Sequence, residues 1–442
     1  MALVVAIELL LKDELLTEAG RCNKLSQQLG ELAKKVVSSQ QRLDSAGCEV
    51  LLQLVEYLEE NPNRTVFNEL LALLRNLAAT SRRSRSILIK SPINETLIRK
   101  VFIENFSASE ASLVSCRRLL QYLGNLVGDV EDDSSIWESI IERERIFKRM
   151  LGCEDPKISL YTAFTLINLV RGDSLSRLFD IRDFVELLEL LISTVLRHEN
   201  EWSLLILEKV ITSDRFAANF EPLSMNSKHF LLDLMCEKAS HSDSSVFHVP
   251  REFVPLCVRH VKTHLDRVRV ERALDDFDEG LLLLKMITIL AHVSLDHKHA
   301  LGHDLELLVM CIECLKAVHA AGKKGEKGLD PRSDLDALAG NKSEVFEHPL
   351  FGLKRDLVRL IGNMSYQHKV NQDTVRELQG LELLCDMSSL DARNPFITQW
   401  VVLALRNLLE NNLENQKVVA TFTRKEVQSD SPILKELGIQ LS

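Results

Sequence analysis

A leucine-rich run that ends in asparagine and then leucine or methionine recurs along this chain, and it restricts the possible folds more than any other feature. Successive asparagines are 49, 43, 195 and 44 residues apart. A period of about 40–47 residues is typical of armadillo and HEAT repeats, and the long step then holds about four and a half units. We therefore predict an all-α fold, an armadillo/HEAT-like helical-repeat solenoid. The asparagines are Asn76, Asn125, Asn168, Asn363 and Asn407, at the ends of LLALLRNL, LLQYLGNL, YTAFTLINL, DLVRLIGNM and LALRNL.

The composition favours helices over sheets. The 442 residues include only 17 glycines and 10 prolines, about half of the usual shares, so long elements are rarely interrupted. Aromatic residues make up 5% of the chain, and leucine is abundant. Leucine is a strong helix former, whereas aromatic and β-branched residues are enriched in strands. The apolar share of 45% supplies a core and excludes general disorder.

One helix shows why the units must stack. The helix expected over 396–408 is apolar around most of its circumference, and such a helix has to be enclosed by neighbours. We expect each unit to begin at a turn with proline, where Asn or Asp can cap the helix. The three turns are Asn61-Pro62, Asp155-Pro156 and Asn394-Pro395. A second pair recurs eight and nine residues after the asparagine, as Asn371-Gln372 and Asn415-Gln416.

Glycine and charge interrupt the pattern once at length. Residues 321–348 hold four glycines and many charges, which indicates a flexible insertion. We therefore predict four parts. They are an N-terminal armadillo-like array over 1–320, the insertion over 321–348, C-terminal repeats over 349–424 and a tail or cap over 425–442.

Charge and hydropathy exclude several partners. A net charge of −10 argues against nucleic acid and against anionic membranes, because both select a basic face. No uncharged apolar stretch reaches about 18 residues, so we expect no membrane insertion. The N-terminal MALVVAIELLLKDELL predicts an amphipathic helix rather than a signal peptide, since no basic segment precedes the apolar run. Nine scattered cysteines suit a reducing compartment.

No catalytic motif is present, so we predict no enzyme, no catalytic residues and no cofactor. Gly322-Lys323-Lys324-Gly325 lacks the spacing of a phosphate-binding loop. Cys311 and Cys314 could be half of a zinc site, but no second pair accompanies them, so we expect core packing and no metal. We expect surface roles for His297, His299 and His303. The basic run at 82–86 is either a phosphorylation segment or, as we favour, a solvated loop.

The recurrent asparagines are the best candidates for a binding site. Their amides could bind an extended peptide along a concave groove, or each could tie its own loop to its helix end. Lys209 and Ile289 replace asparagine in two units, which favours the structural alternative. The candidate partner-binding residues are Asn76, Asn125, Asn168, Arg359, Asn363, Arg406 and Asn407.

A pocket for nuclear-localisation signals is not expected. Such a pocket needs tryptophan four residues before the asparagine, and Arg359 stands there before Asn363. Trp400 instead lies seven residues before Asn407.

Residues 353–416 resemble the C-terminal domain of the ataxin-10 family. The similar segments are LVRLIGN, the NQD that follows it, NPFITQW and RNLLENNLENQ. A weaker resemblance covers most of the rest of the chain, including LQYLGNL at 120–126 and LELLVMCIECLKAVHAAGK, and the N-terminus has no clear counterpart.

The resemblance implies a non-catalytic, armadillo-repeat scaffold in the cytoplasm, with perinuclear, centrosomal, basal-body or midbody sites. It implies roles in neurite outgrowth, neuronal survival through Ras–MAP kinase signalling, and cytokinesis. The implied partners are a G-protein β subunit and O-GlcNAc transferase, and homo-oligomers are left open. Two alternatives stand beside this function: a regulatory subunit that stimulates a partner enzyme such as a protein glycosyltransferase, and a cryptic thiol enzyme.

Overall fold

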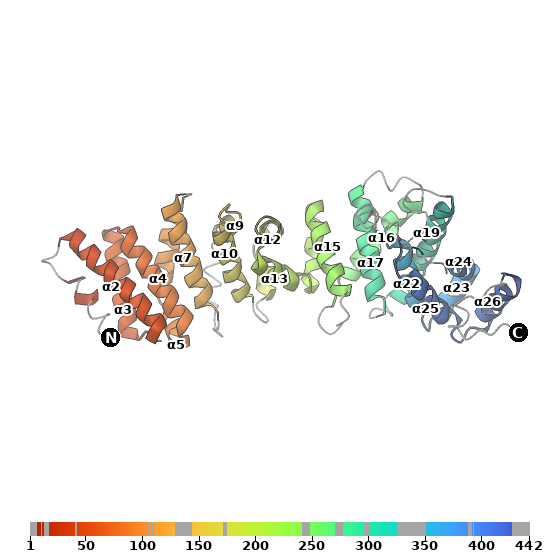
Figure 1. Cartoon of the computed structure of the whole chain (residues 1–442), viewed down its shortest axis with the longest axis horizontal. Helices are drawn as coiled ribbons and strands as arrows, with labels where there is room; N and C mark the ends of the chain where they lie inside the picture. The colour runs from red at the N-terminus through yellow and green to blue at the C-terminus, as the bar shows by residue number, and fades with distance from the viewer. Residues whose placement is uncertain are drawn as a thin grey trace. The chain divides into compact units, whose positions relative to one another are not determined.

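The predicted all-α fold is confirmed. The computed structural model describes residues 7–9, 11–12, 17–39, 42–104, 106–107, 109–128, 144–170, 175–240, 248–269, 277–295, 301–324, 351–387, 391 and 393–426. These residues form helices and connecting turns, without a strand among them (Figure 1). They divide into two compact units, residues 1–210 and 211–442. Within the described ranges, no helix combines the length and the apolarity that a membrane crossing requires.

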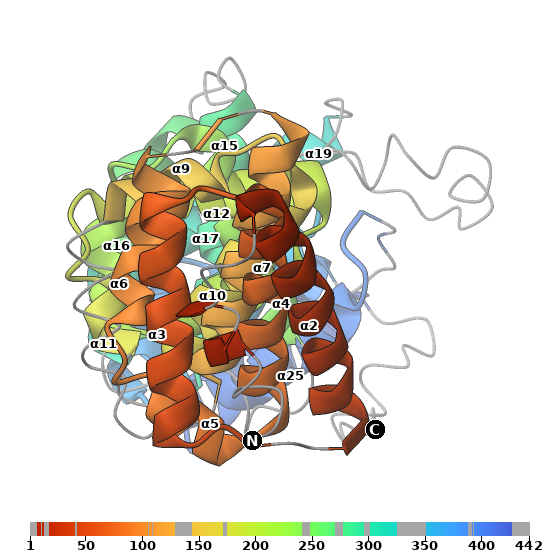
Figure 2. The same ribbon diagram turned by 90° about the vertical axis from the view of Figure 1, so that its left-hand side faces the viewer.

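The first unit is a stack of helices in which α2, α4, α7, α10 and α13 pack in succession. Figure 2 views this unit from its N-terminal end, with α2 and α3 in front. Asn76, Asn125 and Asn168 lie near the ends of α4, α7 and α10, as the repeat predicts. The described elements are α2 (Glu18–Ser39), α3 (Ser45–Glu60), α4 (Arg64–Thr80), α5 (Arg82–Leu88), α6 (Ile93–Ile98), the π-helix η1 (Arg99–Glu104), α7 (Glu110–Leu126), α9 (Glu144–Leu151), α10 (Pro156–Leu169), α11 (Leu175–Leu178), α12 (Phe184–His198) and α13 (Glu201–Val210).

The second unit repeats this arrangement, with α15, α17, α22 and α25 packed in succession. On one side, α16 packs against α17 and α19, and α19 packs against α22 and α23. The described elements are the 3-10 helix η3 (Asp214–Phe216), α14 (Ala217–Phe220), α15 (Met225–Ser240), α16 (Phe253–Arg269), α17 (Phe277–Val293), α19 (Leu305–Lys323), α22 (Leu353–Met364), α23 (Lys369–Glu377), α24 (Gly380–Asp386), α25 (Ile397–Leu409) and α26 (Leu413–Glu426).

Two of the four predicted parts lie largely outside the described ranges. Residues 325–350 and 427–442 are not described, so the insertion and the tail stay predictions. The beginning of the 321–348 segment belongs to the end of α19. Because α19 packs directly against α22, the helices on either side of this segment belong to the same compact unit.

The expected helix starts are right in one case and wrong in two. Asp155 caps α10 by accepting hydrogen bonds from the backbone N–H groups of Lys157 and Ile158, and Pro156 is the first helical residue. The cap of α4 is Asn63, two residues after the predicted Asn61. A polar residue just before a helix can cap only if its side chain reaches a free N–H group, and here Asn63 reaches that of Val66.

At α25 the expected cap has a different task. The helix starts at Ile397, and Asn394 instead accepts a hydrogen bond from the backbone N–H of Arg355, at the start of α22. The residue before α25, Phe396, has a φ of 65° and is 69% exposed, although its apolar character suggested burial. Asn394 therefore links two successive repeats.

The basic run at 82–86 is a helix, not a loop. It forms the first part of α5, and Ser81 caps it by accepting from the N–H of Ser84. Ser84 is buried, and its hydroxyl accepts a hydrogen bond from the backbone N–H of Leu43. Of the two serines in this run, Ser86 is the exposed one and is therefore accessible to modification.

Candidate functional site

The repeated asparagines of the first unit connect neighbouring helices. The side-chain amide of Asn125 donates to the carbonyl oxygen of Arg75 at 3.4 Å, and that of Asn168 donates to the carbonyl oxygen of Gly124 at 3.0 Å. Each acceptor directly precedes the asparagine of the preceding repeat. Asn76 extends the series with a 3.0 Å hydrogen bond to the carbonyl oxygen of Ala33 in α2. The amides therefore form a ladder from one repeat to the next.

The same relationship holds in the second unit. The side-chain amide of Asn407 donates to the carbonyl oxygen of Gly362 at 3.0 Å, directly before Asn363. Asn363 itself donates to the hydroxyl of Ser294 at 2.7 Å, after the end of α17. Both asparagines are buried. A buried amide needs hydrogen-bond partners, and the neighbouring helix supplies them.

These contacts give the asparagines a structural role that differs from the one expected. We expected each side chain to bind its own loop, whereas the amides reach the preceding repeat. The asparagines do so in both units, and no peptide is needed to satisfy these donors. A partner-binding role for them stays a prediction.

Glycine allows the close approach that the ladder requires. A Cβ atom on Gly362 would lie 2.7 Å from Cβ and 2.8 Å from Cα of Ala404 in the next helix. A Cβ atom on Gly124 would lie 2.4 Å from the ring of Phe164. Real Cβ contacts are longer, so any larger residue would push the next helix away from the glycine carbonyl that its asparagine binds.

A second ladder explains the recurrent Asn-Gln pairs. The amide of Asn371 donates to the carbonyl oxygen of Met364, in its own repeat, at 2.7 Å. It also donates to the carbonyl oxygen of Gly302, in the preceding repeat, at 2.8 Å. The Asn371 side chain thus closes the loop of its own repeat and joins that repeat to the preceding one.

The next repeat has an equivalent arrangement. Asn415 donates to the carbonyl oxygen of Leu408 at 2.9 Å and to that of Gln372 at 3.1 Å. The Gln372 side chain donates to the carbonyl oxygen of Asn407 at 2.9 Å. Asn371, Gln372 and Asn415 are buried, and their amides donate to backbone carbonyl oxygens, which gives them a structural role. Gln416 is exposed and donates to the carbonyl oxygen of Leu409.

Arg359 provides a different kind of feature. Its guanidinium carbon lies 4.4 Å from the ring centroid of Trp400, so a cation from α22 covers an aromatic face from α25. Arg359 is half-buried, and its Nε has no hydrogen-bond partner among the described residues. Burial lowers the pKa of Arg359, yet an arginine remains charged at neutral pH.

Polar side chains from two helices surround this arginine. Asp356 is buried and accepts hydrogen bonds from the hydroxyl of Thr288 at 2.7 Å and from Nε of Arg355 at 2.7 Å. The Nδ1 of His292 lies 2.8 Å from the carbonyl oxygen of Thr288. Burial lowers the pKa of His292, and the charge of Arg359 lowers it further. We name this set the Arg359 cluster: Thr288, His292, Arg355, Asp356, Arg359 and Trp400.

The predicted site residues are thus divided among different environments. Asn363 and Arg359 share α22, and Asn407 and the exposed Arg406 are neighbours on α25. Only Arg359 of the seven belongs to the Arg359 cluster. The other cluster members were not predicted, because their proximity depends on the register between helices. A sequence signal existed nonetheless, since Arg359 stands where a pocket for nuclear-localisation signals has tryptophan.

Four of the cysteines lie in environments that make a thiol unreactive. Cys311 and Cys314 are buried in α19. Burial raises the pKa of both thiols, that of Cys314 to about 12. Burial also raises the pKa of Cys116 and Cys236 to about 12. Thiols of this kind stay protonated at neutral pH and are poor nucleophiles.

Three other residues have the chemistry of metal ligands. His260, His264 and Glu279 lie together in the second unit, and their ligand atoms are all within 4.8 Å of one another. The expectation of no metal assumed that neither a second cysteine pair nor a spaced histidine pair accompanies Cys311 and Cys314, whereas His260 and His264 have the His-x3-His spacing. Of the three histidines expected at the surface, His297 and His299 lie outside the described residues, and His303 packs against the ring of His368.

Comparisons with known proteins identify relatives over most of the chain. The model of the family "Spinocerebellar ataxia type 10 protein domain" matches residues 353–442. "Ataxin-10" of Homo sapiens is 28% identical over 385 residues, which are 81% of this chain and 78% of the relative. "Ataxin-10 homolog" of Dictyostelium discoideum is 41% identical over 90 residues, 20% of this chain and 15% of the relative. A crystal structure of an engineered protein aligns with 92% of this chain and 99% of its own, at 14% identity and a TM-score of 0.35, too low to support an argument.

Proposed function

We propose that this chain, which belongs to the ataxin-10 family, is a non-catalytic protein-interaction scaffold. Its stacked repeats place side chains from α17, α22 and α25 next to one another in the Arg359 cluster. The described cysteines with a resolved pKa shift are all shifted upwards, which disfavours the cryptic thiol enzyme.

The observation that carries the proposal is the pairing of Arg359 with Trp400. Among the described residues, Arg359 contacts the Trp400 ring but forms no ion pair. The nearby carboxylate of Asp356 instead accepts hydrogen bonds from Thr288 and Arg355. Arginine and tryptophan are enriched at the energetic centres of protein interfaces. A carboxylate or a main-chain carbonyl of a partner would bind the guanidinium, which forms no ion pair among the described residues.

We propose the finer role on the basis of the resemblance to this family. We expect a cytoplasmic protein, with centrosomal or midbody pools, that acts in neurite outgrowth, neuronal survival signalling and cytokinesis. We expect a heterotrimeric G-protein β subunit and O-GlcNAc transferase among its partners. The acidic net charge agrees with protein partners rather than nucleic acid.

Affinity capture of the intact chain, read by mass spectrometry, tests this function. We expect the wild type to retain a defined set of proteins and Arg359→Ala to lose at least one of them while it remains folded. Arg251→Ala is the matched control, because Arg251 is an exposed arginine of the same unit outside the Arg359 cluster. Identical captured sets for all three proteins, each shown to be folded, would remove Arg359 from the interface.

The regulatory-subunit alternative is separated by an activity measurement. A captured glycosyltransferase is assayed with and without the purified chain. A scaffold leaves the turnover of the transferase unchanged on a free substrate, whereas an activating subunit increases it.

A further inference from the structure

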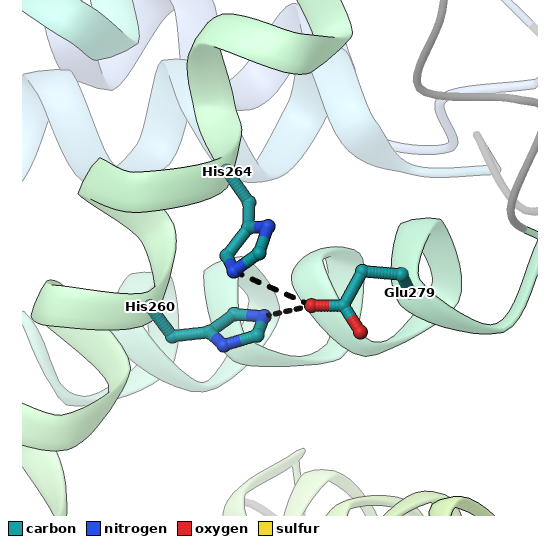
Figure 3. Close-up of side chains that lie close together, drawn as sticks. All are labelled: His260, His264 and Glu279. Atoms are coloured by element: carbon teal, nitrogen blue, oxygen red, sulfur yellow. Dashed lines mark ion pairs between the residues drawn. The ribbon is translucent and has the colours of Figure 1, made fainter.

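Two histidines and a glutamate from adjacent helices of the second unit converge in a way that the scaffold function does not use. His260 and His264 are one turn apart on α16, and Glu279 lies in the first turn of α17 (Figure 3). The Nε2 atoms of both histidines lie 3.4 Å from the same carboxylate oxygen, Oε1 of Glu279. The two imidazole rings are stacked, with centroids 4.3 Å apart. All three side chains are mostly buried, with exposures of 12%, 18% and 23%.

These distances suit a metal ion better than a hydrogen bond. Zinc binds nitrogen and oxygen ligands at about 2.0–2.1 Å, so two ligands at a tetrahedral angle are about 3.3–3.4 Å apart. Both nitrogen–oxygen distances have this value. A good N–H···O hydrogen bond is shorter, at about 2.7–3.2 Å. The Nε2 of His260 is buried and has no hydrogen-bond partner among the described residues.

The residue types agree with this geometry. Histidines four residues apart on a helix present their rings to one side, which is the arrangement that zinc-binding helices use. Burial lowers the pKa of His260, and the neutral imidazole is the form that binds a metal. Glu279 supplies the negative charge that offsets part of the charge of a divalent cation.

We propose that His260, His264 and Glu279 bind one zinc ion, with a water molecule as fourth ligand. The site would connect α16 to the first turn of α17. The residue after His260 is Val261, whereas zinc peptidases of the H-E-x-x-H type have their general base there. The set therefore lacks the general base of these peptidases, and we assign the zinc ion the role of joining the two helices. This proposal departs from the sequence-based expectation of no metal.

Metal titration of the untagged, metal-stripped full chain tests the proposal. We expect one equivalent of zinc to bind by calorimetry and to raise the melting temperature, because a ligand that binds the folded state stabilises it. Cobalt should bind with a visible absorption band and without a thiolate-to-cobalt charge-transfer band, since none of the three ligands is a cysteine. A charge-transfer band at one equivalent would place the metal at cysteines and overturn the assignment.

Variants locate the site. His264→Gln and Glu279→Gln should each weaken zinc binding by at least about 10–100-fold, the range seen when outer partners of metal ligands are removed. His303→Gln is the matched control and should bind like the wild type, because His303 faces His368 outside this cluster. Unchanged affinity in both ligand variants would refute the proposal.

A measurement on the wild type is independent of whether the variants fold. Zinc should protect His260 and His264 from acylation by diethyl pyrocarbonate, mapped by mass spectrometry, and should leave His303 equally reactive. Equal labelling of His260 and His264 with and without zinc contradicts the site. The scaffold function does not depend on this result, since capture through the Arg359 cluster is measured separately.

Discussion

The side-chain amide of Asn407 lies 3.0 Å from the carbonyl oxygen of Gly362, one repeat earlier in the stack. The same distance separates Asn168 from the carbonyl oxygen of Gly124 in the other unit. In both cases the glycine directly precedes the asparagine of its own repeat. The glycine permits the approach of the next helix, and the asparagine of that helix then donates to the carbonyl oxygen of the glycine. The Gly-Asn pair is therefore a device for packing successive repeats.

Replacing Gly362 by alanine should destabilise the second unit. The new Cβ would lie 2.8 Å from the backbone Cα of Ala404, and backbone atoms cannot move aside as a flexible side chain can. Overpacking of this kind costs about 1–3 kcal/mol, measured by urea unfolding. Gly302→Ala is the matched control, since its nearest neighbouring atom would be 3.8 Å away. Equal stability of the two variants would show that the helices separate without cost.

Removing the amides of the ladder should also lower stability. Asn407→Ala leaves the carbonyl oxygen of Gly362 without this donor, at a cost of about 1–3 kcal/mol in the free energy of unfolding. Asn363→Ala should act similarly through Ser294. Thermal melts and affinity capture of the double variant separate structure from binding. Loss of a partner with an unchanged melting temperature would contradict the structural role and support the groove.

The repeat period predicted the helices and the equivalence of the asparagines, but not what the asparagines bind. Sequence spacing places a residue along its own helix, whereas a hydrogen bond between repeats depends on the register of two helices. At α17 the spacing suggested Ile289 as the position equivalent to asparagine. Asn363 instead binds Ser294, five residues later, because the repeats between Asn168 and Asn363 differ in length.

The residues of the two candidate sites could not be grouped from the sequence, for the same reason. Arg359 and Trp400 are 41 residues apart and meet only because α22 and α25 are neighbours. Glu279 joins His260 and His264 across the contact of α16 with α17. The His-x3-His spacing was visible in the sequence, but its third ligand was not.

Asp155 should contribute to stability in two separable ways. It caps α10, and it forms an ion pair with Arg117 of α7. Asp155→Ala removes both the cap and the ion pair, and loss of the cap alone costs about 0.5–2 kcal/mol in the free energy of unfolding. Asp155→Asn keeps a capping side chain and loses only the charge. Urea unfolding should therefore rank the wild type above Asp155→Asn and Asp155→Ala lowest. Equal stability of the two variants would mean that the cap contributes nothing.

The charge of Asp155 also gives a pH dependence. The hydrogen bond from Arg117 lowers the pKa of Asp155, so the folded state holds this proton less tightly than the unfolded state. The stabilisation is present above the unfolded pKa of about 3.9 and is lost as the pH falls through the lower folded value. The wild type should lose more stability than Asp155→Asn in this acidic range. A parallel loss in both proteins would exclude the pair as its source.

His292 should make the second unit sensitive to mild acid. Its pKa is lowered by burial and then by the charge of Arg359, while Asp356 opposes the shift and Arg355 adds to it. In the unfolded chain its pKa is about 6.5, so below this pH the unfolded state binds a proton that the folded state binds less well. Stability therefore falls as the pH decreases from about 6.5 towards the folded pKa of His292. His292→Gln should reduce this loss, measured by urea unfolding at a series of pH values. Arg359→Gln should reduce the loss of stability less than His292→Gln does, because burial is the larger cause of the lowered pKa and remains in this variant. A steeper loss of stability in His292→Gln than in the wild type would show that His292 is stabilised in its charged form.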